Sequence, residues 1–167
     1  MLEINLKIIV LAALIPLVIG FIWYNKKVFG TAWMKAAGVT EEDGKGANMV
    51  LIFGLTFVFS FFLAFSMQFM VIHQFHLYSI WANDPTMNQP GSEINNLITE
   101  IMTRWGHNFR TFKHGALHGT LGGIMIALPI LGINALFERK SLKYILINAG
   151  YWIVSMALMG GIICQWA

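Results

Sequence analysis

Four long stretches of the chain contain no Asp, Glu, Lys or Arg, and they cover residues 8–25, 46–83, 114–137 and 144–167. In a helix, about 20 apolar residues cross the roughly 30 Å hydrocarbon core of a bilayer. Each stretch is long enough for one crossing. The pattern therefore predicts an all-α integral membrane protein, a four-transmembrane-helix bundle in a single domain. The expected spans are about 4–25, 47–76, 113–137 and 143–166.

The second apolar stretch is longer than one crossing requires. From Met49, about 24 helical residues at about 1.5 Å each reach the far interface near His73, so the rest should project beyond the hydrocarbon. A turn-rich segment, residues 83–91, follows. Ser92 is then placed to cap a short helix whose apolar residues recur at spacings of three and four. We therefore predict a short interfacial helix between the second and third spans.

The third span carries small residues at regular spacing. Gly115, Gly119 and Gly123 are four residues apart and form a row along one helix face. Glycines at this spacing allow two helix backbones to approach closely in a membrane. We predict helix packing at this row, with another span or with a second protomer as the partner. Pro129, further along the same span, predicts a kink.

Composition agrees with a protein surrounded by lipid. The chain is 57% hydrophobic and 11% charged, whereas soluble domains carry about 25% charged residues. Its mean hydropathy is +0.65. The formal net charge of +3 is assigned to topology and anionic lipid rather than to nucleic acid, so no nucleic-acid partner is expected. The single cysteine, Cys164, excludes an internal disulfide.

The distribution of basic residues predicts an orientation. With four spans, the two short loops share one side of the membrane, and the termini share the other side with the loop between spans two and three. The short loops carry seven basic residues, Lys26, Lys27, Lys35, Lys45, Arg139, Lys140 and Lys143. The opposite side carries four, Lys7, Arg104, Arg110 and Lys113. The positive-inside rule then predicts that the short loops of this multi-pass protein are cytoplasmic and that both termini lie on the outer side, the periplasm if the membrane is a bacterial inner membrane.

Four of the five histidines gather where the second span ends and the third begins. His73 and His76 are three residues apart, and His114 and His118 are four apart, so each pair should share one helix face. Because consecutive spans are antiparallel, both pairs belong to the same membrane face. On this geometry His73 is expected to be level with His118, and His76 with His114.

Two such pairs could supply four imidazole ligands to a metal. Imidazole binds zinc, copper, iron and nickel, and Met67 and Met70 extend the stripe with thioethers that would favour Cu(I). A transition metal or haem is therefore a candidate cofactor, held by two or more of the four histidines. Two other interpretations are contacts with headgroups, water or backbone carbonyls, and proton handling near neutral pH.

The segment after the first span carries a motif of aromatic residues and glycine, Trp23-Tyr24-Asn25, Val28-Phe29-Gly30, Ala32-Trp33-Met34. With four apolar spans and Trp166 near the end, the chain resembles the bacterial membrane family called domain of unknown function 1761. The resemblance implies a multi-pass membrane protein and no assigned activity. Trp23, Tyr24 and Trp33 suit the headgroup level, and an interfacial anchoring role is expected for the motif, with recognition of a lipid or partner as the alternative.

The sequence contains no phosphate-binding glycine loop, no His-Glu-x-x-His helix and no nucleophile elbow. We therefore name no catalytic residues and favour a non-enzymatic protein. The first hypothesis is an accessory subunit of a membrane assembly, or a homo-oligomer in the lipid bilayer. The second is a metal- or haem-binding protein that uses the histidines. The third is a carrier for a small uncharged or lipid-like substrate.

Overall fold

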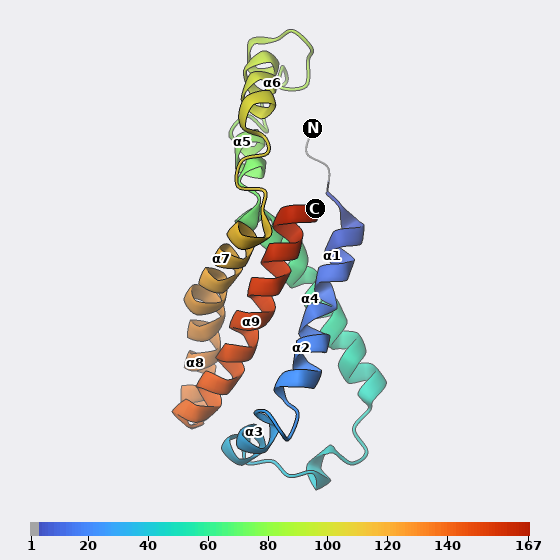
Figure 1. Ribbon diagram of the computed structural model, residues 1–167, viewed down its shortest axis with the longest axis vertical. Helices are drawn as coiled ribbons and strands as arrows, with labels where there is room; N and C mark the ends of the chain where they lie inside the picture. Colours follow the sequence, from blue (N-terminus) through green and yellow to red (C-terminus); the bar gives the residue numbers. More distant parts are fainter. Residues whose placement is uncertain (1–3) are drawn as a thin grey trace.

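The computed structural model describes residues 4–167, and every regular element among them is helical (Figure 1). Four helical segments are long and apolar enough to cross a membrane, which confirms the predicted all-α bundle. The first, Leu6–Trp23, consists of α1 (Leu6–Ala13) and α2 (Ile15–Trp23), and the second is α4 (Met49–Val71). The third, Phe112–Phe137, consists of α7 (Phe112–Gly122), η2 (Gly123–Ala127) and α8 (Leu128–Phe137), and the fourth is α9 (Leu142–Trp166).

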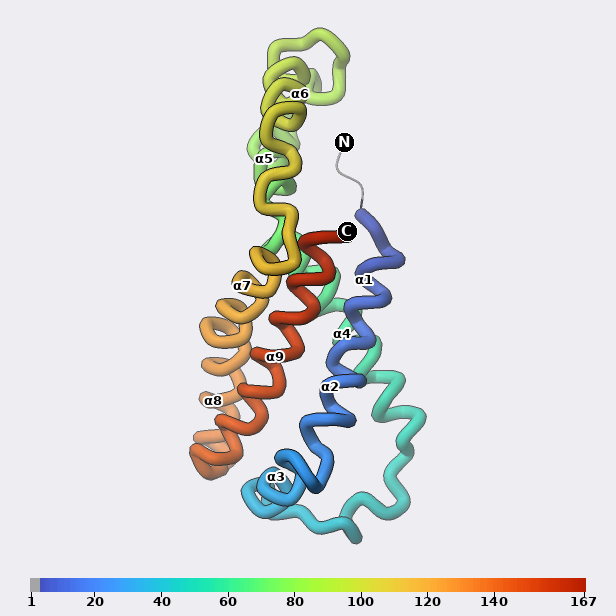
Figure 2. The backbone as a smooth tube through the Cα atoms, in the orientation of Figure 1, coloured from blue at the N-terminus to red at the C-terminus, as the bar shows by residue number. Residues whose placement is uncertain are grey.

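Shorter helices lie at the two ends of the bundle. One end carries α3 (Gly30–Ala37) and the 3₁₀ turn η1 (Glu42–Gly44). The other end carries α5 (Gln74–Ile80), α6 (Glu93–Trp105), the start of α1 and the end of α9 (Figure 2). The expected helix after residue 92 is present as α6, and the Ser92 hydroxyl caps it by accepting from the Asn95 amide at 3.1 Å. Helices α5 and α6 form an antiparallel pair that extends away from the bundle (Figure 1).

The first and third spans are interrupted near their prolines. The first breaks at Leu14, between α1 and α2, because Pro16 has no amide hydrogen for the helix. In the third span a π-helical turn, η2, comes immediately before Pro129, which stands near the start of α8. The predicted irregularity at Pro129 is therefore built from this wider turn, which accommodates one extra residue.

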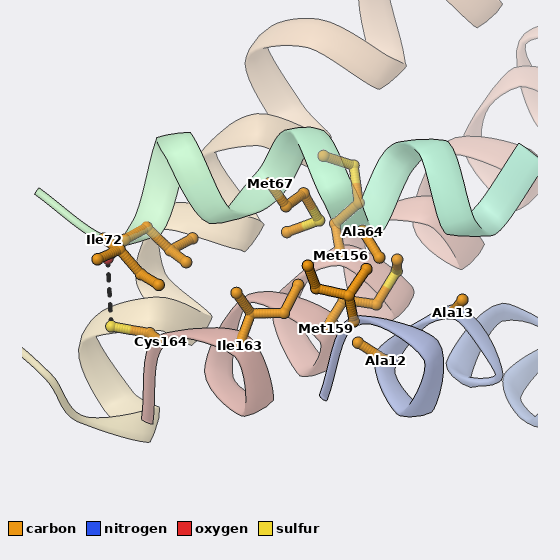
Figure 3. Packing of buried hydrophobic residues seen from close by; sticks show 11 residues of the cluster. Ala12, Ala13, Ala64, Met67, Ile72, Met156, Met159, Ile163 and Cys164 are labelled. Carbon is orange, nitrogen blue, oxygen red and sulfur yellow. Dashed lines mark hydrogen bonds between the residues drawn. The ribbon is translucent and has the colours of Figure 1, made fainter. Parts of the chain in front are cut away.

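The second span ends earlier than its apolar pattern suggests. Helix α4 stops at Val71, not at residue 76, because Ile72 adopts an extended conformation with φ −110° and ψ 94°. The Cys164 thiol on α9 lies 3.2 Å from the Val71 carbonyl oxygen, as Figure 3 shows, so this carbonyl has a partner outside its own helix. Beyond the break, the Gln74 amide group donates to the carbonyls of Gly106 and Asn108, both at 3.0 Å. Tertiary contacts therefore end the helix where hydropathy alone would continue it.

Helix α9 is the central element of the bundle and contacts each of the other three spans. The buried core lies where α1, α4 and α9 meet, and it is formed by alanine, methionine, cysteine and β-branched side chains (Figure 3). Ala64 and Met67 of α4 face Met156, Met159 and Ile163 of α9, and all five are buried. Small residues in a membrane core allow the helices to approach closely.

The glycine row of α7 packs against α9 of the same chain. A methyl group added at Gly115 would overlap the Gly160 carbonyl, and one at Gly119 would overlap the Met156 carbonyl. At Gly123 an added methyl carbon would lie 2.7 Å from the Ile153 α-carbon. Helices α7 and α9 are therefore in backbone-to-backbone contact, and the row forms a contact within the chain.

The aromatic motif after the first span also docks onto α9. The Trp23 indole donates to the Ile147 carbonyl at 3.0 Å. The Tyr24 hydroxyl and the Trp33 indole both donate to the side-chain oxygen of Asn148, at 2.9 and 3.2 Å. We expected these polar groups at the headgroup level, and the structure gives them partners inside the protein. Gly30 is buried, and a side chain there would overlap the Tyr24 carbonyl, so this turn requires glycine.

Asn148→Leu is expected to destabilise the protein without affecting its membrane insertion. The change leaves the Tyr24 hydroxyl and the Trp33 indole without their acceptor, and an unsatisfied buried donor costs about 1–3 kcal/mol. The midpoint of thermal unfolding in detergent should fall by about 3–10 °C. Asn134→Leu is the matched control, because Asn134 makes no side-chain hydrogen bond among residues 4–167. Equal midpoints for the two variants would contradict this role of Asn148.

Candidate metal centre

Three histidines meet where the second and third spans approach one end of the bundle. One ring nitrogen each from His73, His114 and His118 lies within 4.8 Å of the other two. The closest pair is His73 Nε2 and His114 Nε2, at 2.8 Å. The ring centroids are 4.5–5.0 Å apart. We call these three residues the histidine cluster.

Two different local structures position the cluster. His73 follows the extended residue Ile72 and stands at the N-cap position of α5, so the break in the chain sets its direction. His114 and His118 lie in the first turns of α7 and are four residues apart, which places both rings on one face. The Thr111 side chain caps α7 by accepting from the His114 amide at 3.3 Å. Two segments far apart in the sequence therefore supply the three imidazoles.

His76, the fourth histidine of the sequence prediction, is outside the cluster. It is exposed and lines a separate cavity with Phe69, Tyr78 and Met87. The break at Ile72 precedes both residues, and α5 extends away from the bundle, so His76, one turn further along α5, lies beyond the start of α7 (Figure 1). His73 contacts His114 and His118 at nearly equal ring distances, 5.0 and 4.9 Å, rather than pairing with His118 alone.

The methionines of the predicted stripe serve packing. Met67 is fully buried, and its methyl group lies near Gly160 of α9. The Met70 methyl group lies near Gly122 of α7. These contacts pack the spans together, and the candidate ligands considered below are the three imidazole nitrogens.

The chain around Phe109 holds the start of α7 close to His73. Phe109 adopts a left-handed conformation, with φ 62°, which is uncommon for a large side chain. Its ring lies 5.0 Å from the His114 ring and 6.3 Å from the His73 ring, measured between centroids. The Cys164 thiol lies 3.2 Å from the Phe109 carbonyl as well as from the Val71 carbonyl. The end of α9 therefore connects the two segments that carry the histidines.

Further polar contacts fix the same junction. The Gln74 side chain, next to His73, holds the turn that contains Gly106 and Asn108. The Arg110 guanidinium donates to the carbonyls of Cys164 and Ala167. Sequence reasoning did not find Phe109, Gln74 or Arg110 as supports, because their partners are backbone carbonyls that no residue pattern marks.

The cluster favours neutral imidazole, the form that binds metals. Partial burial is the main cause that lowers the pKa of His73, and the charges of His118 and His76 lower it further. At 2.8 Å, one of the two Nε2 atoms of His73 and His114 must donate a hydrogen to the lone pair of the other. In the tautomer that carries its hydrogen on Nδ1, the donor ring would also present a free Nε2 lone pair, and a metal ion could then bind both Nε2 atoms.

The fold and the cluster define a class: a four-span helical membrane protein with three converging imidazoles at one end of the bundle. Comparison of the sequence with known families then identifies the group. The chain belongs to the family described as Protein of unknown function (DUF1761), whose sequence profile matches residues 8–164. The resemblance inferred from the aromatic motif is thereby confirmed. Comparisons with curated proteins and with solved structures gave no match.

Proposed function

We propose that this protein binds a divalent transition-metal ion through His73, His114 and His118, with Zn²⁺ as the first ion to test. The observation that carries the proposal is the convergence of three ring nitrogens within 4.8 Å of one another. Three imidazoles are a ligand set that zinc proteins use, and a fourth position then remains for water or another ligand.

The shortest distance in the cluster, between His73 and His114, suits a small ion after a modest adjustment. Zinc–nitrogen bonds of about 2.0–2.1 Å at tetrahedral angles place two ligand nitrogens about 3.3 Å apart. His73 Nε2 and His114 Nε2 are 2.8 Å apart, so they would separate by about 0.5 Å on binding. His73 is exposed and joins the break between α4 and α5, so its ring has room to make this movement.

Haem fits these residues less well than a single ion does. A haem iron holds two axial ligands on opposite faces of a wide, flat ring. The short distance between His73 and His114, 2.8 Å, leaves no space for such a ring between them. With imidazole ligands only, zinc, copper(II), nickel and iron(II) are all chemically suitable, and the methionines give no reason to prefer Cu(I).

The cluster lies at the end of the bundle that carries the start of α1, the end of α9 and the α5–α6 pair. The excess of basic residues in the opposite loops favours the cytoplasm for those loops. In a bacterial inner membrane the metal would then be taken from the periplasmic side.

The other hypotheses have less direct support. An accessory or homo-oligomeric role relied partly on the glycine row, and that row packs against α9 within the chain. A carrier for small uncharged substrates would need a route across the bundle. A large cavity near the short basic loops opens between α2 and α4 and supports a different role, developed below.

The proposal is tested by measuring Zn²⁺ binding to the purified, detergent-solubilised protein. We expect one tightly bound ion per chain in a titration followed by elemental analysis after desalting. The double variant His114→Ala, His118→Ala is expected to lose this ion, because it retains one of the three ligands.

The matched control is His76→Ala combined with His107→Ala, which removes two histidines near the cluster that are not part of it. This variant should bind zinc like the unchanged protein. If the unchanged protein retains no stoichiometric metal, or if both double variants retain it equally, the proposal is wrong.

A further inference from the structure

A large cavity opens at the opposite end of the bundle from the histidine cluster. It has a volume of about 920 Å³ and lies between α2 and α4, with Tyr151 of α9 also lining it. Cavities that hold small organic ligands have volumes of about 300–1,000 Å³. The ribbon shows the cause, because α4 lies near α1 in the middle of the bundle and diverges from α2 toward the end of the bundle that carries α3 and η1 (Figure 1).

The walls of this cavity are mostly apolar. Leu17 and Phe21 of α2 face Ile52 and Phe53 of α4, and the rings of Phe21 and Phe53 stack with centroids 5.7 Å apart. An apolar cavity does not retain water. Both wall helices are membrane spans with exposed apolar side chains, so hydrocarbon from the bilayer can enter between them.

The polar groups in the deeper wall already have partners within the protein. The Tyr151 hydroxyl donates to the Pro16 carbonyl at 2.8 Å. The Tyr24 hydroxyl and the Trp33 indole donate to Asn148. A ligand would therefore meet aromatic and aliphatic surface inside the cavity and would find its polar contacts at the mouth.

Positive charge is concentrated at the mouth. Lys26 and Lys27 both line the cavity, directly after the end of α2. Lys26 pairs with Glu41 at 2.6 Å, at an exposed position where such a pair contributes little. Lys27 has no carboxylate within ion-pair distance in residues 4–167. An apolar cavity with cationic groups at the membrane surface complements an anionic amphiphile.

We propose that this cavity binds one anionic phospholipid, with an acyl chain between α2 and α4 and the phosphate beside Lys26 and Lys27. Juxtamembrane basic residues attract anionic lipid. The aromatic motif forms part of the site, because Tyr24 and Trp33 hold the turn that carries the lysines against α9. The lipid would fill the space that the divergence of α4 leaves and would support this end of the bundle.

The test uses native mass spectrometry of the full chain, titrated with phosphatidylglycerol or with phosphatidylcholine that has the same acyl chains. We expect one retained phosphatidylglycerol per chain and at least a fivefold preference over phosphatidylcholine. In the double variant Lys26→Gln, Lys27→Gln the preference should disappear. In Thr56→Phe retention of either lipid should fall at least fivefold, because Thr56 lines the cavity and its hydroxyl bonds only the Ile52 carbonyl of its own helix.

Two variants control for charge and for bulk. Lys35→Gln removes a lysine from α3 on the same side of the membrane, and Gly54→Leu adds a side chain to α4 where nothing lies within 4 Å. Neither position lines the cavity, so both should retain the lipid and its preference. The proposal is wrong if the two lipids bind equally, or if the control variants lose the lipid to the same extent as Lys26→Gln, Lys27→Gln and Thr56→Phe. It is also wrong if the cavity holds a second copy of the chain, which would be seen as a dimer that Thr56→Phe dissociates.

Discussion

Replacing Gly119 with leucine will separate α7 from α9 and prevent the bundle from forming a stable fold. A side chain at this position would overlap the Met156 carbonyl, so the two backbones would have to move apart. Overpacking a core typically costs about 1–3 kcal/mol, and contact with rigid backbone leaves little possibility of relaxation. We expect the variant to elute as aggregate in size-exclusion chromatography in detergent, or to unfold at least about 10 °C below the unchanged protein.

Gly54→Leu is the control for this experiment. It makes the same substitution in a membrane span, at a glycine with open space around it. Its unfolding temperature should match that of the unchanged protein within about 2 °C. If Gly119→Leu folds well and unfolds at the same temperature as Gly54→Leu, the close α7–α9 contact does not stabilise the protein.

Replacing His73 with alanine will weaken zinc binding at least about a hundredfold, equivalent to about 2.7 kcal/mol. His73 is the only member of the cluster outside α7, so its removal leaves both remaining imidazoles on one helix. Zinc bound by all three histidines joins the α4–α5 junction to α7. Saturation at about 100 times the Kd should therefore stabilise the unchanged protein by about 2.7 kcal/mol.

The measurement is a competition titration with a zinc-sensitive dye, combined with thermal unfolding with and without zinc. His76→Ala should retain both the affinity and the zinc-dependent rise in unfolding temperature, because His76 lies outside the cluster. The assignment of His73 as a ligand fails if His73→Ala and His76→Ala weaken zinc binding to the same extent.

The four spans were predictable because a bilayer imposes a simple requirement on the chain. Long stretches without charge have no other stable location in a protein of this size, so their number and order follow from hydropathy. The cap at Ser92 was also predictable, since hydroxyl side chains at N-caps satisfy local backbone donors. These features depend on residues close to one another in the sequence.

The features that were not predictable depend on distant contacts. The carbonyls at the end of α4 and in the turn at Phe109 both lie 3.2 Å from the Cys164 thiol of α9, a residue far from either in the sequence. Periodicity continued the second span through residue 76 and so placed both His73 and His76 beside the start of the third span. The chain breaks at Ile72, before both residues, and His76 lies one turn further along α5, outside the cluster. Three of the four candidate residues therefore form the cluster, and the break left no mark in the sequence.

The partners of the glycine row and of the aromatic motif were also beyond local reasoning. Glycines four residues apart show that a backbone can approach, without specifying which one, and the structure identifies α9. Tryptophan and tyrosine near lysines are typical of a headgroup layer. Here a single amide, Asn148, accepts from both Tyr24 and Trp33, and an isolated asparagine in an apolar span does not indicate its donors.

The π-helical turn in the third span sets the rotational register between the two halves of that span. Because the turn holds one residue more than an α-helical turn, everything after it is rotated by about 100° relative to a continuous helix. Gly119 before the turn and Ala135 after it are both buried. Deleting one residue from η2 would rotate Ala135 to another face while leaving His114 and His118 in place. The half of this span that carries His114 and His118 and the half that leads to the loop can therefore change their alignment independently, by insertion or deletion of a single residue.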